Sequence, residues 1–277
     1  MKIYISADGE GISGVVHSEE MHPEGHRYEE FRRLMTMDVN AAIEGAFQAG
    51  ASEVLVNDAH WTMLNVIYEE LDERADLIRG SSKKLSMMEG VQDYDGVCLI
   101  GYHPKVGHSH GLANETMPGP EMYDMRMNGE AVGELEINAA IAGHYDVPII
   151  MASGDQYLAA EVKSHFPHVE TAIVKESIHK WAAKCLSLPR AHQLIRETTA
   201  RAVKGIEQFN PFKVPGPVEL EIEWVSTAAC YKASLVPGSY MKNARTLAYQ
   251  GKDILEAWQG ILACLNLGCT AFDQYYG

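Results

Sequence analysis

Short apolar runs alternate with longer amphipathic segments along the first part of the chain. Four runs are rich in β-branched and other apolar residues and end abruptly in polar ones, which is typical of buried strands; they cover residues 2–7, 53–56, 96–100 and 147–152. Residues 28–49 place apolar side chains at three- and four-residue steps, which predicts a helix that Gly50 can end. The alternation of strand and helix predicts an α/β fold, in which a mostly parallel sheet is flanked by helices.

The later part of the chain adds helices and then changes in composition. Helices are predicted from Gly133 to the turn at 144–148, over 156–166 and over 189–209. The next segment is rich in proline and glycine, as linkers are; it holds Pro211, Pro215, Gly216 and Pro217. We therefore expect an α/β domain over residues 1–210, and a smaller α+β region over residues 211–277 that packs on it or serves assembly.

The predicted C-terminal region contains one amphipathic strand and one helix. Residues 218–225 alternate apolar with acidic side chains, which predicts a strand with one acidic face. Residues 254–267 have the apolar spacing of a helix that is buried on one side. Both elements need a neighbouring surface to cover their apolar sides, which is why we expect this region to pack against the first.

Charge and hydropathy exclude several classes of partner. The chain of 277 residues has 23 lysine and arginine residues against 38 aspartate and glutamate residues, a formal net charge of −15. Such an acidic surface repels phosphate backbones, which argues against nucleic-acid binding. The first apolar stretch reaches Asp8 too early for a signal peptide, and no run approaches the roughly 18 apolar residues of a membrane helix. We therefore expect a soluble cytoplasmic protein with no membrane partner.

The five cysteines do not form a recognisable ligand pattern. Their number is odd and their spacing contains no C-x-x-C pair, unlike a disulfide framework or a cysteine-based zinc site. We expect reduced, mostly buried thiols, so any metal site in this chain has to be built from other side chains.

Candidate metal ligands follow the predicted strands. Open α/β sheets bind ligands where their strands end, so the residues just beyond each strand are the first candidates. Asp8 and Glu10 follow the first strand in a glycine-lined turn, His60 follows the second and His103 follows the third. Glu134 lies in the first turn of a predicted helix. Four separate segments thus deliver five groups that can bind a metal ion.

A mixed set of carboxylates and imidazoles suits zinc or a similar divalent ion, and one carboxylate can bridge two such ions. Two metals about 3.5 to 4 Å apart lower the pKa of a shared water towards about 7, which is hydrolase chemistry. Each residue alone also has an ordinary explanation: Asp8 can cap a turn, His60 and His103 can be hydrogen-bonded core histidines, and Glu134 can favour a helix N-terminus. Their joint occurrence at successive strand ends favours a metal centre.

The same segments resemble a known family. Ser6-x-Asp8-x-Glu10-Gly11 resembles the S-x-D-x-E-G signature of the DppA-type D-aminopeptidases, the M55 family of zinc peptidases. Later landmarks of that family are similar in order and spacing to Val56-Asn57-Asp58-Ala59-His60, Gly101-Tyr102-His103, Val132-Gly133-Glu134-Leu135, Tyr145-Asp146-Val147-Pro148 and Gly154-Asp155. The resemblance covers roughly residues 1 to 190 well and the remainder loosely.

The resemblance implies a dinuclear zinc site, with two zinc ions per subunit. Asp8 would bridge the ions, with Glu10 and His103 completing one site and His60 and Glu134 the other. Members of the family cleave short peptides from the free amino end, several with a preference for D-residues. The founding type assembles as a ring-shaped homodecamer, so the resemblance also implies a short-peptide substrate and a homo-oligomer.

One position departs from the family pattern. A histidine that is held essential for catalysis usually stands in a Ser/Asp-His-Ser/Thr motif after the third strand, and the matching stretch here has Glu115 at that place. A carboxylate near an activated water can serve as general base and pass the proton to the leaving amine. Alternatively, the exchange marks a different substrate or a weakened catalyst. His108 and His110, in the glycine-flanked loop just before, can replace the missing imidazole or lie idle in solvent.

The sequence thus predicts a zinc-dependent aminopeptidase for short peptides, with Glu115 as its catalytic residue. An enzymatic alternative is a dinuclear metallohydrolase of another amide or ester. A non-catalytic metal-containing binding protein is a third interpretation, and a purely structural metal site is a fourth, although structural zinc sites are normally closed and four-coordinate. Trp61, directly after a candidate ligand, either forms a wall of the substrate pocket or packs in the core.

Overall fold

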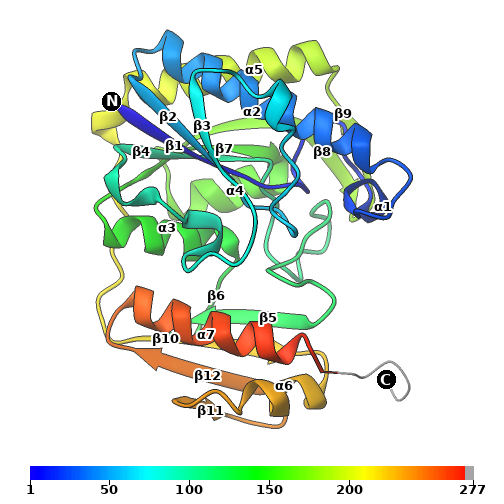
Figure 1. Cartoon of the computed structure of the whole chain (residues 1–277), viewed down its shortest axis with the longest axis vertical. Helices are drawn as coiled ribbons and strands as arrows, with labels where there is room; N and C mark the ends of the chain where they lie inside the picture. The colour runs from blue at the N-terminus through cyan, green and yellow to red at the C-terminus, as the bar shows by residue number, and fades with distance from the viewer. Residues whose placement is uncertain (272–277) are drawn as a thin grey trace.

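The computed structural model describes residues 1–271 and is built around a seven-stranded sheet. Its strand order is β3-β2-β1-β4-β7-β8-β9, and all neighbours pair in parallel except β8 and β9 (Figure 1). The strands are Ala75–Ile78 (β3), Glu53–Asp58 (β2), Lys2–Ala7 (β1), Gly96–Ile100 (β4), Ile149–Asp155 (β7), Glu170–His179 (β8) and Ala182–Cys185 (β9). The predicted α/β fold with a mostly parallel sheet is confirmed.

Helices cover both faces of this sheet. Ile3 and Ile5 of β1 share one buried cluster with α2 (Tyr28–Gln48) and α5 (Leu188–Lys204), while Tyr4 points to the opposite cluster. That second cluster contains residues of α3 (Glu134–His144) and α4 (Gln156–His165). The alternation along β1 therefore buries both faces, as expected of a central parallel strand. Shorter helical segments are α1 (Ser18–Met21) and the 3₁₀ turns Tyr68–Glu70, Ser86–Met88, Val91–Asp93 and Ile206–Gln208.

A second sheet of five antiparallel strands lies apart from the first. Its order is β11-β12-β10-β5-β6, with strands Ser239–Met241 (β11), Thr246–Gly251 (β12), Val218–Trp224 (β10), Met122–Met127 (β5) and Glu130–Ala131 (β6). The helices α6 (Thr227–Ala233) and α7 (Ile254–Gly268) accompany it. Because β5 and β6 precede residue 210, this sheet combines strands from both of the regions predicted from the sequence.

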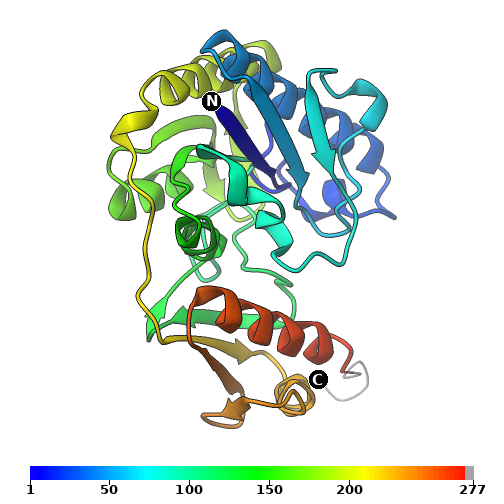
Figure 2. The ribbon, with the colours of Figure 1, turned by 60° about the vertical axis from the view of Figure 1, so that its left-hand side comes forward.

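Helix α3 joins the two sheets through a shared apolar core. Ile137 and Ile141 of α3 belong to the same buried cluster as Trp258 and Ile261 of α7 and Trp224 of β10. Figures 1 and 2 show α3 between the main sheet and the layer formed by α7. The N-terminus of α3, which carries Glu134, is consequently held from both sides.

The three central strands end level with one another. Ala7 of β1 is in register with Asp58 of β2 and with Ile100 of β4. The residues that follow these strands therefore emerge side by side at one edge of the sheet. Separately, across the described residues none of the helices combines the length and apolar character that crossing a bilayer requires.

Candidate metal centre

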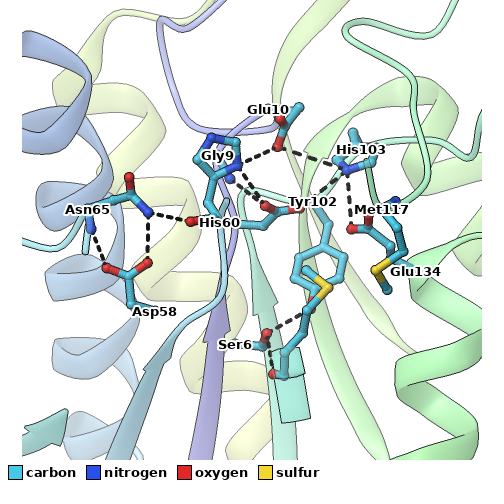
Figure 3. Close-up of polar contacts among 12 residues, drawn as sticks. Ser6, Gly9, Glu10, Asp58, His60, Asn65, Tyr102, His103, Met117 and Glu134 are labelled. Atoms are coloured by element: carbon cyan, nitrogen blue, oxygen red, sulfur yellow. Dashed lines mark hydrogen bonds and ion pairs between the residues drawn. The ribbon is translucent and has the colours of Figure 1, made fainter. Parts of the chain in front are cut away.

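The five residues predicted as metal ligands lie together at this edge of the sheet. Asp8 and Glu10 follow β1, His60 follows β2, His103 follows β4, and Glu134 is the first residue of α3. All five are buried. Figure 3 shows the side chains of Glu10, His60, His103 and Glu134 pointing towards a common centre. The topology thus brings together residues that are up to 126 positions apart in the sequence.

Asp8 lies between the two imidazoles. Its Oδ1 atom is 3.2 Å from Nδ1 of His60, and its Oδ2 atom is 3.3 Å from Nε2 of His103. Oε2 of Glu10 is 3.2 Å from the same nitrogen of His60, and Oε2 of Glu134 is 3.3 Å from the same nitrogen of His103. One carboxylate that faces a histidine on each side has the geometry of a bridging ligand.

Asp8, Glu10 and His103 meet the spacing expected around a single ion, because one ligand atom from each lies within 4.8 Å of the others. The shortest contacts, however, pair Glu10 with His60 and Glu134 with His103. These contacts group the two glutamates with the two imidazoles in the opposite way to the arrangement that the resemblance implies.

Backbone and outer contacts fix the orientation of these side chains. Nδ1 of His103 donates to the carbonyl oxygen of Pro104 at 3.0 Å, which leaves Nε2 facing the carboxylates. Oε1 of Glu134 accepts a hydrogen bond from the backbone N–H of Met117 at 2.6 Å. Asn65 donates through Nδ2 to the carbonyl oxygen of His60 at 2.6 Å, which closes the turn behind that residue (Figure 3).

The turn after β4 requires glycine. Gly101 has a φ of 77°, in the left-handed region that favours glycine, and a Cβ atom there would lie 2.4 Å from the carbonyl oxygen of Asp8. The absence of a side chain therefore lets the chain segment leading to His103 pass close to the one that carries Asp8 and Glu10.

The pKa values show how strongly these groups interact. Burial raises the pKa of Asp8, but hydrogen bonds and charges from His103 and His60 outweigh it and hold that pKa well below its ordinary value. Burial lowers the pKa of both histidines, but the neighbouring carboxylates outweigh it and raise both values. Burial raises the pKa of Glu134, against the lowering effect of His103.

The donor set fits a metal ion. Oδ2 of Asp8, Oε2 of Glu10 and Nε2 of His60 are buried and make no hydrogen bond within residues 1–271. Buried polar atoms are rarely left in this state without a ligand. The cluster also holds three carboxylates against two imidazoles, so bound cations would compensate the excess negative charge. Oxygen and imidazole nitrogen donors in this combination suit zinc.

Comparison with known proteins decides the family. The family model described as D-aminopeptidase, Peptidase M55, matches residues 1–263. The chain belongs to the M55 family of D-aminopeptidases. It is 38% identical to a D-aminopeptidase of Bacillus subtilis (strain 168) over 269 residues, which cover 96% of this chain and 97% of that protein.

The similarity extends to the three-dimensional structure. A solved structure of a Bacillus subtilis protein, described as the Zn-dependent D-aminopeptidase DppA, a self-compartmentalizing protease, matches with a TM-score of 0.94 at 38% identity. The match covers 98% of this chain and 99% of that one. The M55 resemblance seen in the motifs is therefore confirmed, and it includes the C-terminal region that the motifs covered only loosely.

Glu115 lies beside the five clustered residues. Its side chain is mostly buried, and burial, followed by the charge of Glu10, raises the pKa of Glu115 to about 9. The charge of Glu134 also raises this pKa, whereas the charge of His103 lowers it. The chain thus places a carboxyl group next to the cluster, at the position where the family motif has a histidine.

The loop histidines have other contacts. Nδ1 of His108 accepts hydrogen bonds from the backbone N–H groups of His110 and Gly111, at 3.2 and 2.9 Å, and the His108 ring lies 4.5 Å from the Tyr157 ring. His110 is exposed, with its Nδ1 atom 2.8 Å from the Ser109 hydroxyl. Within the part of the chain that the structure describes, neither imidazole forms a hydrogen bond or ion pair with the five clustered residues.

Trp61 is not a core residue, since 57% of its surface is exposed. Its backbone has a positive φ of 43°, its ring centroid lies 6.5 Å from that of His60, and the His22 ring packs against it at 4.7 Å. A residue whose conformation is unfavourable and whose ring faces solvent beside the cluster fits a pocket wall better than core packing.

The sequence analysis overlooked Lys175, a buried lysine of β8 that contacts the segment carrying Glu10. Its only signal in the sequence is a lysine among apolar positions of a strand, which most often lies at a surface.

Proposed function

We propose that this protein is a zinc-dependent aminopeptidase that removes residues from the amino end of short peptides, including peptides with D-amino acids. The observation that supports this most directly is Asp8, which lies between His60 and His103 with Glu10 and Glu134 beside them. A family match over residues 1–263 and a relative described as a Zn-dependent D-aminopeptidase support the same activity.

We propose two zinc ions per chain, with Asp8 shared between them and His60 and His103 on different ions. The two oxygens of Asp8 face different imidazoles, which supports the bridging role. Zinc bound at this cluster supplies a Lewis acid for the peptide carbonyl and an activated water. Asp8, Glu10, His60, His103 and Glu134 would hold it, and the carbonyl oxygen of Pro104 would keep the His103 ring in the required tautomer.

We assign proton transfer to Glu115. Its carboxyl group lies next to Glu10 and is largely shielded from water, so it can reach a water held at the cluster. Bound cations would oppose the charges of Glu10 and Glu134 that raise its pKa, and would so favour its carboxylate form. In that form it would accept a proton from the water and donate it to the nitrogen of the departing amine. His108 and His110 are weaker candidates because their contacts lie within their own loop and on Tyr157.

The test is hydrolysis of a panel of D- and L-aminoacyl dipeptides by the zinc-loaded wild type, Glu115→Gln and His110→Ala, with zinc measured on the same samples. We expect Glu115→Gln to lower kcat by about 10²- to 10⁴-fold while zinc content stays unchanged. We expect His110→Ala to keep wild-type activity. Turnover that survives in Glu115→Gln but falls in His110→Ala would contradict the assignment, and a wild type that binds zinc but cleaves none of the peptides would favour another amide or ester.

We also propose that the chain forms a homo-oligomer, a ring-shaped homodecamer, with residues 211–277 serving assembly. The solved relative is described as self-compartmentalizing. The second sheet, α6 and the residues just after β10 and α6 expose large apolar side chains that suit an interface; they include Tyr123, Val225, Tyr231 and Leu235. Light scattering coupled to gel filtration gives the subunit number directly, and Tyr231→Glu with Leu235→Glu is expected to lower it if this face is an interface.

The cytoplasm is the compartment that we propose for this protein. All five cysteines are free thiols in the structure, which suits a reducing environment. Fractionation of cells that produce the protein, followed by immunoblotting, tests this location.

A further inference from the structure

Three backbone carbonyl groups of the segment between β1 and α1 converge on a single buried ammonium group. Nζ of Lys175 donates hydrogen bonds to the carbonyl oxygens of Glu10, Ile12 and Val15, at 2.6, 2.9 and 2.7 Å. Lys175 belongs to β8 and is only 1% exposed. A residue 165 positions away in sequence therefore holds the backbone of Glu10 itself.

These three hydrogen bonds use all three N–H groups of a protonated lysine. Over residues 1–271, no carboxylate forms a salt bridge with this ammonium, so the backbone carbonyls are its direct partners. A buried cation is costly unless its hydrogen bonds are complete. Any shift of the segment would leave the charge of Lys175 less well satisfied, and the position of the Glu10 backbone is restricted for that reason.

A buried anion holds the same segment through an N–H group. Oδ2 of Asp38, on α2, accepts a hydrogen bond from the backbone N–H of Ser13 at 2.8 Å, and Asp38 has no exposed surface. Its Oδ1 atom lies 3.3 Å from Nε2 of His192, on α5. The segment that carries Glu10 is thus hydrogen-bonded to the ammonium group of Lys175 in the sheet and to the carboxylate of Asp38 in the flanking helix.

We propose that Lys175 and Asp38 are positioning residues that hold the Glu10 carboxylate in place for zinc binding. This inference rests on the metal centre described under the proposed function. Neither side chain belongs to the five clustered residues, so each acts through the backbone of residues 10–15. Groups that orient metal ligands from behind typically affect metal affinity by about 10- to 100-fold.

The first experiment measures zinc affinity of the purified full-length chain by competition with a chromophoric chelator. Lys175→Met keeps the length of the side chain and removes the three hydrogen bonds, and we expect zinc to bind about 10- to 100-fold more weakly. Lys163→Met is the matched control, because Nζ of Lys163 also donates to backbone carbonyls, those of Pro167 and Val169, outside the segment of Glu10. We expect this control to keep wild-type zinc affinity. Equal affinities of Lys175→Met and the wild type would overturn the inference.

A double-mutant cycle separates positioning from a general loss of structure. If Lys175 acts through Glu10, Lys175→Met weakens zinc binding in the wild type but has little further effect in a Glu10→Gln background. Fully additive losses would contradict positioning through Glu10.

Asp38→Asn provides a second variant of unchanged shape in case Lys175→Met does not fold. We expect this variant to weaken zinc binding by several-fold while its far-ultraviolet circular dichroism matches the wild type. Wild-type zinc affinity in Asp38→Asn would exclude a positioning role for Asp38. A wild type without measurable zinc affinity would instead overturn the proposed metal centre itself.

Discussion

At the scale of single residues, position relative to the strand ends decides which polar groups meet. Asp8 and His60 form a contact of 3.2 Å because β1 and β2 end level, with Ala7 opposite Asp58. Asp58, two residues beyond the predicted end of its strand, instead accepts hydrogen bonds from the backbone N–H groups of Asn65 and Val66. The two carboxylates have the same chemistry, but only the first faces the imidazoles.

Trp61 provides a prediction about substrate binding. If its exposed ring forms a wall of the pocket, Trp61→Ala removes an apolar contact to the substrate but no group that takes part in the chemistry. We expect KM for a dipeptide to rise by about 2- to 10-fold with kcat nearly unchanged, since aromatic contacts contribute about 0.5 to 1.5 kcal/mol. Tyr68→Ala, another exposed aromatic residue, is the control. A kcat that falls while KM stays constant would argue against a pocket wall.

Lys83 makes the stability of the protein depend on pH. Burial lowers the pKa of Lys83 to about 8, and its Nζ atom donates to the carbonyl oxygen of Asp58 at 2.7 Å. The unfolded chain keeps the ordinary value near 10.5, so between about pH 8 and 10.5 the unfolded state binds more protons. This residue therefore increases the free energy of unfolding as the pH rises through that range, by at most about 3 kcal/mol.

Urea unfolding at pH 7.5, 8.5 and 9.5 checks this expectation in the wild type and in Lys83→Met. The variant is expected to show a smaller increase of unfolding free energy with pH than the wild type. Identical pH profiles would show that Lys83 is not responsible.

At the scale of elements, the tight turn after β4 allows a test of whether its close approach to the Asp8 backbone is needed for stability and zinc binding. Gly101→Ala adds a Cβ atom 2.4 Å from the carbonyl oxygen of Asp8, at a φ of 77°. Gly50→Ala is a matched control: its φ is 95°, but a Cβ there meets nothing within 4 Å. We expect Gly50→Ala to cost about 1 kcal/mol from backbone strain alone, and Gly101→Ala to cost more and to weaken zinc binding. Calorimetric melting measures the stability of each variant, and a zinc titration measures its zinc affinity. Equal effects of the two variants would show that the contact of the added Cβ atom with the carbonyl oxygen of Asp8 has no consequence for the site.

The sequence predicted the elements whose apolar residues form a long helical pattern or a continuous run. Strands β1, β2, β4 and β7 and helix α2 were recognisable because their apolar residues are continuous or helically spaced. Strand β5 was not predicted, since its Met-Tyr-Asp-Met-Arg-Met sequence mixes buried methionines with charged residues. Its place is set by pairing with β10, which is about 95 residues later in the chain, and local patterns carry no information about such pairing.

Local sequence position likewise explains which residues of the candidate site could be predicted. Its five clustered residues were predictable because they stand directly after strands or at the start of a helix. Lys175 and Asp38 were not, because they lie within a strand and a helix and make their contacts across the fold. Sequence position indicates which side chains lie at a strand end. The side chains that hold the segments after the strands in place can be identified only from the tertiary structure.

At the scale of the whole molecule, an acidic chain also buries three carboxylates together at the proposed zinc site. The chain has a formal net charge of −15, and Asp8, Glu10 and Glu134 are buried together. A chelator that removes zinc would leave these carboxylates facing one another, so we expect the melting temperature to fall. Binding at a zinc concentration 100 times the Kd stabilises a folded protein by about 2.7 kcal/mol.

Differential scanning calorimetry of the zinc-loaded and chelator-treated protein measures this change, with magnesium as the control ion. A melting temperature that is independent of zinc, at zinc concentrations that saturate the protein, would contradict the proposed link between metal and stability.

The measurement that tests the central claim most directly is the zinc content and D-aminoacyl dipeptide hydrolysis of wild type and Asp8→Ala on the same samples. The account predicts two zinc ions per chain and turnover in the wild type, and loss of both ions and of turnover in Asp8→Ala, because both imidazoles face this carboxylate. Asp155→Ala is the control, since Asp155 is also buried at a strand end but accepts hydrogen bonds from the backbone N–H groups of Leu112, Tyr157 and Leu158. Full zinc content in Asp8→Ala would contradict the bridging role on which the proposed function depends.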